Sequence, residues 1–536
     1  MNSLVFFAIC AIALSAGYKF YGTAFEKFLG VDPSRPTPAH TKHDGIDYVP
    51  AKNWQFLFGH HFSSIAGAGP VIGPVIAVSM WGWGPATLFI ILGTVFMGGI
   101  HDMGALLMSI RYDGKSVADV SEEMVSRRAR LIFSWFVLIA LIVVVSVFVY
   151  FCTQTFVIDP RVVVPSLGLI PVAVLVGLLV YRFKTGMAPA TILGLALLVA
   201  LIFLGRILPV TLPAGYAATG WTIILLAYCF CASVMPVNIL LQPRDYLSSY
   251  LLLFGIVTGF AGVILTRPDF TAPFFVKVNT AEGPLWPMLF VTIACGAISG
   301  FHSLVSAGTT SKQISTEADT KRIGFGAMVV EAFLAAIAVI AVAGGFGSFG
   351  ALNASLAKGG PVTAFAEGFS YLTAPIFGKY GSLIAIILLN SFILTTLDTS
   401  TRIARYILQE LFNDMDRYLA TALIVLAGGW VALSGEWKSI WPIFGAVNQL
   451  IAALTLVVIS SWLLSQKKHV RFTMVPAVFM LFTSIGALVW QFGKFMAEGN
   501  WFLMAVSVIL MALSCSMILE VYAWARKRIK YQKVRV

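Results

Sequence analysis

Charged residues are scarce in this chain. Asp, Glu, Lys and Arg make up 11% of the 536 residues, whereas 59% of the residues are hydrophobic. An ordinary soluble domain contains about a quarter charged residues. This composition therefore excludes an ordinary soluble domain. The formal net charge is +12, but no basic stretch is interleaved with aromatic residues, which excludes nucleic-acid binding. The composition predicts an all-α polytopic membrane protein that lies in the lipid bilayer.

Cysteine pairs and enzyme motifs are equally sparse. The six cysteines lie in apolar runs and form no C-x-x-C pair, so the sequence predicts neither disulfides nor a thiolate metal site. Metal-binding H-x-x-x-H spacing is missing from the predicted helices, and so are the H-E-x-x-H and G-x-S-x-G signatures of enzymes. We therefore expect no metal, no cofactor and no enzymatic activity.

Long apolar runs dominate the chain. About 20 apolar residues are needed to cross a bilayer, and by this criterion the sequence predicts about fifteen transmembrane helices. They lie near residues 2–20, 54–80, 85–110, 131–156, 163–181, 188–208, 219–240, 245–266, 285–312, 323–346, 380–403, 417–433, 438–464, 473–493 and 501–525. No clear A-x-A cleavage site follows the first 22 residues, so we interpret them as a retained helix.

The basic residues are distributed unevenly among the connectors. They cluster around 111–130, 182–184, Arg244, 321–322, 402–405, 467–471 and 526–535. These positions fall in every second connector, which the positive-inside rule places in the cytoplasm. The amino terminus is then predicted outside and the carboxyl terminus in the cytoplasm. Of the cation-poor connectors, 267–284 and 345–379 are long, and the second is expected to form an extracytoplasmic lid.

Two of the predicted helices carry the same glycine-rich interruption. The pattern Gly59-x-His61-x4-Ala66-Gly67 recurs as Gly300-x-His302-x4-Ala307-Gly308. Loose backbone inside a bilayer is tolerated only where it lines a cavity, and two broken helices in corresponding halves indicate a transporter binding site. The interrupted helices are the second and the ninth, so they cross the membrane in opposite directions, as an inverted repeat requires.

Each interruption defines one wall of a predicted substrate site. The first comprises Ala66, Gly67, Ala68, Gly69 and Pro70, and the second, centred on Ser306–Thr310, contributes Ser303, Ser306, Gly308 and Thr309. Freed amides at half-helix amino ends suit a carboxylate, and freed carbonyls suit a cation. The alternative for both segments is close packing of small residues between helices.

Ionisable residues within the spans are candidates for function. They are His60, His61, His101, Asp102, His302, Glu331 and Asp398. A histidine can exchange a proton between pH 5 and 8; the alternative is a neutral ring bonded to a carbonyl across a helix contact. Asp398 shares a helical face with Ser391, Thr395 and Thr399, which predicts a hard-cation or proton site. Its alternative is an ion pair with Arg402, one turn further along.

Several segments together resemble a known family. They are Asp44–Pro50 (DGIDYVP), Phe58–Phe62 (FGHHF), Ala66–Pro70 (AGAGP), Ser299–Ser303 (SGFHS), Leu397–Arg402 (LDTSTR) and Trp441–Leu450 (WPIFGAVNQL). The chain resembles the carbon-starvation (CstA) family of bacterial and archaeal inner-membrane transporters. It departs from the family in its compact length and in His101, where we expect Gln.

The resemblance implies a LeuT-like core of the amino acid–polyamine–organocation type, built from five-plus-five inverted repeats. Residues 54–208 and 285–464 would form the repeats, with 1–22, 219–266 and 473–525 as additions. It implies symport of peptides or pyruvate with H⁺ or Na⁺ across the inner membrane. The coupling ion would lie among Ser391, Thr395, Thr396 and Asp398, beside the break of the second helix. His61 and Asp102 are the candidates for proton handling.

Other functions and folds are weaker alternatives. A channel or facilitator for small organic anions is the main one, because broken helices also line pores. A membrane nutrient sensor would need a soluble signalling domain, and no connector is long enough to form one. A seven-plus-seven repeat would place the breaks on the third helix of each repeat rather than on the first. The sequence leaves the oligomeric state open.

Overall fold

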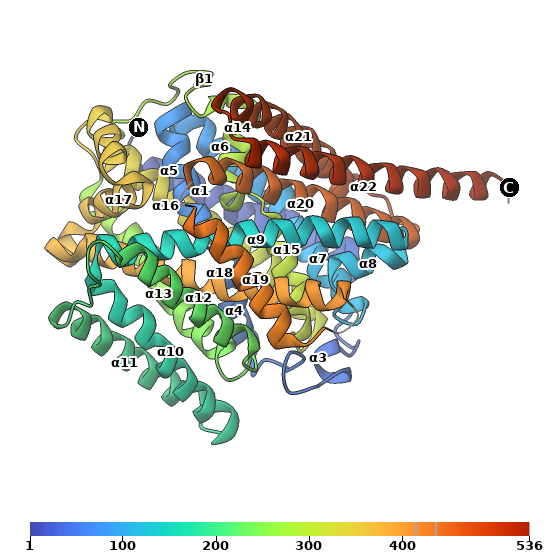
Figure 1. Cartoon of the computed structure of the whole chain (residues 1–536), viewed down its shortest axis with the longest axis horizontal. Helices are drawn as coiled ribbons and strands as arrows, with labels where there is room; N and C mark the ends of the chain where they lie inside the picture. Colours follow the sequence, from blue (N-terminus) through green and yellow to red (C-terminus); the bar gives the residue numbers. More distant parts are fainter. Residues whose placement is uncertain (413–414, 435–436, 535–536) are drawn as a thin grey trace.

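The computed structural model describes residues 1–412, 415–434 and 437–534, and most of them are helical. Figure 1 shows long helices that run side by side along the horizontal axis. The strands β1 (Asn279–Thr280) and β2 (Gly283–Pro284) pair antiparallel, with Asn279 opposite Pro284. The chain therefore builds its core by packing helix against helix.

The helices of the first part of the chain are α1 (Ser3–Ala16), α2 (Thr23–Leu29), α3 (Pro38–Thr41), α4 (Trp54–Ile65), α5 (Gly69–Trp81), α6 (Trp83–Gly93), α7 (Gly99–Arg111), α8 (Val117–Met124), α9 (Arg127–Ile158), α10 (Val163–Gly177) and α11 (Met187–Ile207). The π-helical turn Gly17–Gly22 joins α1 to α2. The first span therefore continues to Leu29, past its predicted end, and stops where Gly30 adopts the left-handed conformation of a helix cap.

The helices that follow are α12 (Ala217–Val234), α13 (Leu241–Thr266), α14 (Leu285–Ile293), α15 (Gly300–Gly308), α16 (Gly326–Gly344), α17 (Phe349–Phe377), α18 (Gly381–Leu411), α19 (Arg417–Leu433), α20 (Trp437–Ser465), α21 (Arg471–Glu498) and α22 (Trp501–Val534). Short 3-10 turns at Ala294–Gly296 and Thr310–Lys312 flank α15. These turns interrupt the ninth span on both sides of a short regular helix.

The predicted membrane spans agree with the structure. Within the described residues, thirteen helical segments are long and apolar enough to cross a bilayer, and the bent pair α4–α5 makes a further span. The shorter apolar helix α19 corresponds to the predicted helix at 417–433. Together they match the fifteen predicted helices, and the all-α polytopic fold class is confirmed.

Segment 345–379 is a helix, which its Gly, Ala and Ser content did not indicate. It forms α17, which is interrupted where Gly360 has φ +71° and Pro361 follows. Alanine has the highest helix propensity of all residues, so the many alanines here outweigh the glycines everywhere except at the Gly360–Pro361 step. The segment expected to form an extracytoplasmic lid is therefore helical, with a kink at Gly360.

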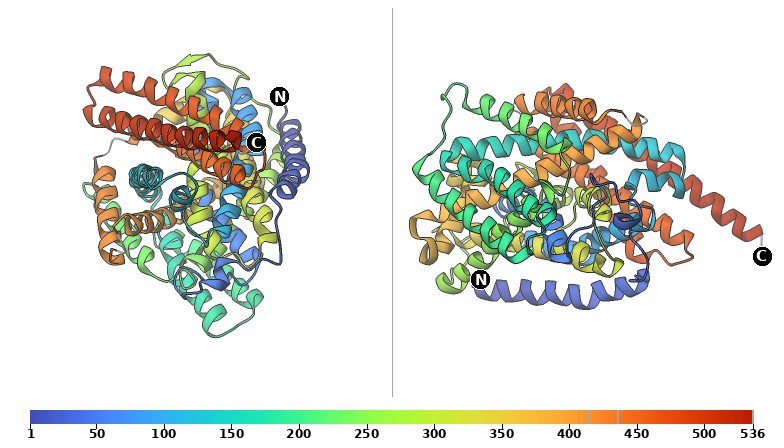
Figure 2. Two further views of the ribbon diagram at one scale, coloured as in Figure 1. Left: turned by 90° about the vertical axis from the view of Figure 1, so that its right-hand side faces the viewer. Right: turned by 90° about the horizontal axis from the view of Figure 1, so that it is seen from below.

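The helices differ in how deeply they lie in the bundle. The most apolar 18-residue stretch of the span Trp441–Ser465 of α20 is buried throughout, whereas only 22% of the corresponding stretch of Met187–Ile207 of α11 is buried. Figure 1 shows α10 and α11 projecting from the bundle, and both views in Figure 2 place α1 at its edge. The exposed side chains of α11, such as Ile192 and Phe203, are large and apolar, as expected for a lipid-facing helix.

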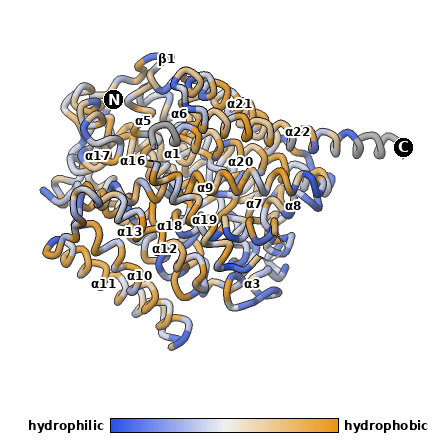
Figure 3. The backbone as a smooth tube through the Cα atoms, viewed as in Figure 1, coloured by the Kyte–Doolittle hydropathy of each residue, from blue (hydrophilic) through white to orange (hydrophobic). Residues whose placement is uncertain are grey.

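The connectors gather at two opposite ends of the bundle. We call one end the basic side, because it joins the cation-rich connectors: Arg111 pairs with Glu317 at 3.1 Å, and Lys468 donates to the Leu29 carbonyl at 2.9 Å. Figure 3 shows hydrophilic residues around α3 and α8 at this end. At the other end, the cation-poor side, the Phe270 N–H donates to the Met1 carbonyl at 3.0 Å.

Candidate functional site

The first predicted break lies where the sequence placed it. Helix α4 ends at Ile65, α5 begins at Gly69, and their axes differ by 42°. A Cβ atom at Gly67 would lie 2.8 Å from the ring of Phe148 on α9 and 2.9 Å from Thr396 Oγ1 on α18. Glycine is therefore required at this point because two neighbouring helices approach the backbone closely.

The second predicted break coincides with the end of α15, but the same span has an earlier break that the sequence did not predict. Ser303, Ser306 and Gly308 lie in the regular helix α15, and Thr309 follows its end. The chain leaves helical geometry earlier, between Ala294 and Ser299. The reason is tertiary: the side-chain oxygen of Asn448 on α20 accepts the Phe301 N–H at 2.8 Å and so replaces a helical partner at the start of α15. The alternative of small-residue packing describes Gly308 better, because a Cβ there would touch Ile403.

The two breaks meet inside the bundle. A Cβ at Gly69 would lie 2.5 Å from Cys295 Sγ, and a Cβ at Gly296 would lie 3.5 Å from Pro70 Cα. The repeated Gly-x-His motifs, in contrast, lie in α4 and α15, the half-helices that adjoin the basic side. An inverted repeat about an axis in the membrane plane exchanges the two sides. The motif match is therefore not a match between symmetry-related positions.

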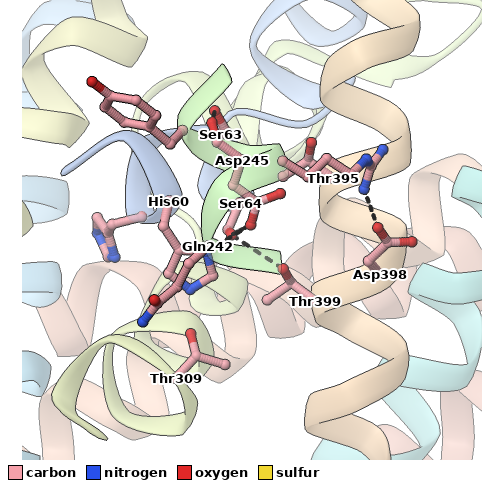
Figure 4. A network of polar contacts seen from close by, with 12 residues as sticks. His60, Ser63, Ser64, Gln242, Asp245, Thr309, Thr395, Asp398 and Thr399 are labelled. Atoms are coloured by element: carbon pink, nitrogen blue, oxygen red, sulfur yellow. Dashed lines mark hydrogen bonds and ion pairs between the residues drawn. The ribbon is translucent and has the colours of Figure 1, made fainter. Parts of the chain in front are cut away.

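A polar cluster joins the end of α4 to α13 and α18. His60 Nδ1 lies 2.6 Å from Asp245 Oδ2, and both side chains are fully buried. The Ser64 hydroxyl lies 3.1 Å from Thr399 Oγ1, and the Ser64 carbonyl accepts the Thr396 hydroxyl at 3.0 Å. Figure 4 shows His60, Ser64, Asp245 and Thr399 facing one another across the three helices. This cluster fixes the last turn before the first break.

Asp398 has a different partner from the one considered in the sequence. It forms an ion pair with Arg244 of α13, both side chains being buried, and it accepts the Tyr228 hydroxyl at 2.5 Å. The alternative ion pair with Arg402 is wrong, because Arg402 donates to the Ala232 carbonyl at 2.7 Å and contacts Asp47. Arg244 is accordingly part of a transmembrane helix and does not belong to a basic connector.

The predicted face of α18 is only partly brought together. Thr396 and Thr399 contact α4, whereas Asp398 faces α13 and α12. Thr395 donates to the carbonyl of Ser391 at 2.9 Å, and the buried Ser391 hydroxyl has no hydrogen-bond partner in the described part of the chain. Thr396 and Thr399 therefore reach the last turn before the break, whereas Thr395 bonds within its own helix and Asp398 faces away.

His61 and Asp102 take part in separate contacts. His61 Nδ1 lies 2.8 Å from Thr310 Oγ1, while its Nε2 is buried without a partner among the described residues. Asp102 contacts two histidine rings, with 2.7 Å to His101 Nδ1 and 3.0 Å to His302 Nδ1. Sequence reasoning missed Arg244 and Asp245, although a charged pair after Pro243 inside an apolar run was the available signal.

A cavity of about 1100 Å³ opens on the cation-poor side. Its walls come from α5, α9, α14, α17, α20 and α21 and from the connector before α14. Thr292, two residues before the second break, lies in its lining, and so do Lys277, Lys358 and Lys494. Glu282 and Glu498 line the cavity as well. Among the described residues, no carboxylate lies within ion-pair distance of the three lysines, so their charges face the cavity without a direct partner.

The basic side is sealed by the segment before α4. Asp47 pairs with Arg402 at 3.1 Å and with Arg405 at 3.6 Å, and it accepts the Tyr406 hydroxyl at 2.5 Å. Burial raises the pKa of Asp47, but Arg402, Arg405 and Lys312 outweigh this effect and lower the pKa below its ordinary value. Asp47 therefore stays ionised at neutral pH and ties its segment to α18.

Two helix breaks that meet below a cavity on the cation-poor side define the class: a secondary transporter with a LeuT-like fold. Solved structures agree. The manganese transporter of Eremococcus coleocola, solved with an aromatic bis-isothiourea compound, superimposes with a TM-score of 0.55 over 90% of this chain and 99% of that one. The sequence identity is 14%, so this likeness concerns the fold alone.

Within that class, the chain belongs to the family described as carbon starvation protein CstA, whose profile matches residues 2–357 and 347–487. A peptide transporter CstA of Campylobacter jejuni is 31% identical, covering 94% of this chain and 82% of the relative. The pyruvate/proton symporter BtsT of Escherichia coli is 30% identical, covering 88% and 79%. The relatives are named as transporters and not as enzymes, so the family resemblance and the transport class are confirmed.

Proposed function

We propose that this protein imports a small carboxylate-bearing nutrient, pyruvate or a short peptide, by symport across the bacterial or archaeal inner membrane. The names of the relatives, two peptide transporters CstA and a pyruvate/proton symporter among them, support this substrate class. The basic side faces the cytoplasm in this proposal, which leaves the amino terminus outside and the carboxyl terminus inside. The cavity then opens to the exterior, from which the substrate arrives.

The observation that carries the proposal is the meeting of the two breaks beneath the cavity. Ala66–Pro70 forms one wall of the substrate site, and residues 294–299 form the other. The amino end of α5 at Gly69 and the amino end of α15 at Gly300 both present backbone N–H groups and a partial positive charge. This pair of helix ends suits a carboxylate, which pyruvate and peptides share. Residues 303–309 follow on the basic side of the site.

His61 belongs to the substrate site in this proposal. It lies on the last turns of α4, and its Nε2 is a buried polar atom without a partner in the described part of the chain. Buried polar groups are normally hydrogen-bonded, so a ligand oxygen is a suitable partner. A His61→Gln variant, which keeps an N–H donor, is expected to retain more substrate binding than His61→Ala.

A proton suits the coupling role better than Na⁺. Of the proposed ion ligands, Thr395 and Thr396 donate to the carbonyls of Ser391 and Ser64, and Asp398 pairs with Arg244. The Ser391 hydroxyl alone among these four side chains has no partner in the described part of the chain. The buried histidines and carboxylates offer several places for a proton instead. We further propose that residues 54–208 and 285–464 are the inverted repeats, because each begins with one of the broken spans.

Uptake into proteoliposomes tests this function. Labelled pyruvate and a labelled dipeptide are supplied under a proton gradient alone or a sodium gradient alone, with protein-free liposomes as the control. Accumulation that collapses when the gradient is discharged is expected for one of the two substrates. Rapid equilibration without accumulation would indicate a channel or facilitator and would contradict the proposal.

A further inference from the structure

His302 lies between two buried carboxylates. Its Nδ1 is 3.0 Å from Asp102 Oδ2 on α7, and its Nε2 is 3.3 Å from Glu331 Oε2 on α16. His101 Nδ1 contacts the other oxygen of Asp102 at 2.7 Å. The side chains of all four residues are completely buried. Three helices therefore place two acids and two imidazoles in one enclosed group.

The charge of this group must be balanced by protons. In the described part of the chain, neither Lys nor Arg lies within ion-pair distance of Asp102 or Glu331. An uncompensated charge in the interior of a membrane protein is costly. With His302 protonated and both acids ionised, the group would still carry one net negative charge. One further proton makes it neutral, so the group has a place for one exchangeable proton.

The contacts indicate which acid holds that proton. Asp102 is bonded to two rings, and hydrogen bonds of this kind stabilise an ionised carboxylate. Neither oxygen of Glu331 has a hydrogen-bond partner among the described residues, and the approach of His302 Nε2 lacks hydrogen-bond geometry. Glu331 is thus the carboxyl with fewer polar contacts, and its surroundings favour the neutral, protonated form.

In the described part of the chain, the neighbouring helices bring no Lys, Arg or further carboxylate into ion-pair contact with this cluster; the nearby titratable groups are His61 of α4 and Cys295, which precedes α15. Helix α4 contributes His60 and His61, which contact Asp245 and Thr310 instead. From α18, Asp398 pairs with Arg244 and Arg402 pairs with Asp47. Of the acids of α8, Asp119 and Glu122 pair with Arg130, and Glu123 pairs with Lys115. The side chains that α20 directs at α15, Asn448 and Thr455, do not titrate. On the side that faces α15, the polar neighbour of Glu331 is therefore His302.

The position of His302 links this group to the substrate site. His302 is the third residue of α15, the helix that begins directly after the second break. A substrate at the break contacts the amino end of α15, and Glu331 lies on the separate helix α16. A shift of α15 relative to α16 would change the distance from His302 to Glu331 and thereby the proton affinity of Glu331.

We propose that Asp102, His302 and Glu331 form the coupling proton site, and that Glu331 is the carboxyl that takes up and releases the proton. The step is a simple ionisation: the O–H bond of Glu331 breaks when its proton passes to water that enters from the cytoplasm, and it forms again when the carboxylate takes a proton from water that enters from outside. This assignment rests on the proposed proton-coupled import. It names Glu331, instead of His61, as the residue that carries the coupling proton.

The test compares Glu331→Gln with wild-type protein in proteoliposomes. Glutamine imitates the protonated acid, so exchange of labelled for unlabelled substrate without a gradient is expected to continue and to lose its pH dependence. Accumulation driven by a proton gradient is expected to fall at least tenfold. Glu367→Gln, which removes a carboxylate bonded to Ser355 on α17, is the matched control and should accumulate substrate normally.

Two outcomes separate the proposals. If wild-type protein accumulates neither substrate under a proton gradient, the proposed function fails. If wild-type and Glu331→Gln accumulate substrate equally and with the same pH profile, the assignment of Glu331 fails while the function stands.

A chemical measurement on wild-type protein covers the case in which Glu331→Gln does not fold. Dicyclohexylcarbodiimide attaches to protonated carboxyl groups in apolar surroundings, and mass spectrometry of the digested protein locates the label. We expect Glu331 to be labelled less as the pH rises, and we expect the extent of labelling to change when the substrate is present. Complete inhibition of uptake with Glu331 unlabelled would overturn the assignment.

Discussion

The two ends of the bundle are built in opposite ways. The cation-poor half contains a cavity of about 1100 Å³ whose lining includes three lysines that form no ion pair with the described residues, together with Glu282 and Glu498. The basic half is filled: Arg244 and Asp398 pair inside it, and Asp47 closes it against α18. The difference teaches that the large cavity lies on one side of the breaks and a network of buried ion pairs on the other. A transporter that exposes its substrate site first to one side and then to the other must open one half of the bundle while it closes the other half. A substitution in either half therefore tests how that half is held.

The largest effect is expected where the basic half buries charge. Arg244→Met removes one partner of the buried pair and leaves Asp398 uncompensated, which costs about 3–5 kcal/mol of stability. The melting temperature of the detergent-solubilised protein should fall sharply. Arg206→Met, at an exposed arginine that contacts Tyr380, is the control and should melt like the wild type. An unchanged melting temperature for Arg244→Met would mean that this pair does not hold the basic half together.

A smaller effect is expected at the boundary between the halves. Gly67→Ala would force a Cβ against Phe148 and Thr396, and overpacking of this kind costs about 1–3 kcal/mol. Because the strain falls on the break, we expect uptake to be lost while the protein still purifies. Gly493→Ala is the matched control, because nothing lies within 4 Å of a Cβ at that position. Normal uptake by Gly67→Ala would show that the break is less tightly enclosed than its contacts indicate.

The closure of the basic side should loosen in Asp47→Asn. Hydrogen bonds to a charged group contribute about 1.5–3 kcal/mol, so amide exchange in residues 44–50 should accelerate, as measured by mass spectrometry. Asp113→Asn is the control, because its ion pair with Lys42 is exposed. Unchanged exchange in Asp47→Asn would contradict the role of Asp47 as the closing residue.

The same closure should be insensitive to pH over the physiological range. The pKa of Asp47 is lowered in the folded protein, so its stabilising charge is present above the ordinary pKa of an aspartate and is lost only as the pH falls below it. Corrected for intrinsic rates, exchange of residues 44–50 in wild-type protein should be constant from pH 5 to pH 8. Opening of this segment between pH 5 and 8 would point to a different titrating group.

The smallest effect is expected in the open half. Replacing Lys277, Lys358 and Lys494 by Gln, one at a time, should raise the KM of an anionic substrate by roughly 1.5- to 5-fold, since exposed charges contribute about 0.2–1 kcal/mol each. The increase should shrink at high salt because these charges are screened. Lys379→Gln, next to Tyr380 and outside the cavity lining, is the control. An equal change in KM for Lys379→Gln would remove the cavity lysines from substrate attraction.

Much of the fold could be predicted from local patterns. The apolar runs gave the spans, and the AGAGP sequence at Ala66–Pro70 gave the first break, because each depends on neighbouring residues only. The second break could not be located in this way. Its position depends on Asn448, which lies 147 residues from Phe301 along the chain and supplies the missing acceptor.

The sequence by itself determined that this is a polytopic helical membrane protein with two interrupted spans, and its motifs placed it in a transporter family. Only the tertiary structure decided which buried groups meet. His60 finds Asp245 across 185 positions, and His302 finds Asp102 across 200. The physical reason is that a buried polar group must be satisfied by whatever the packed helices bring to it. That choice depends on the packing of distant helices and leaves no local pattern in the chain.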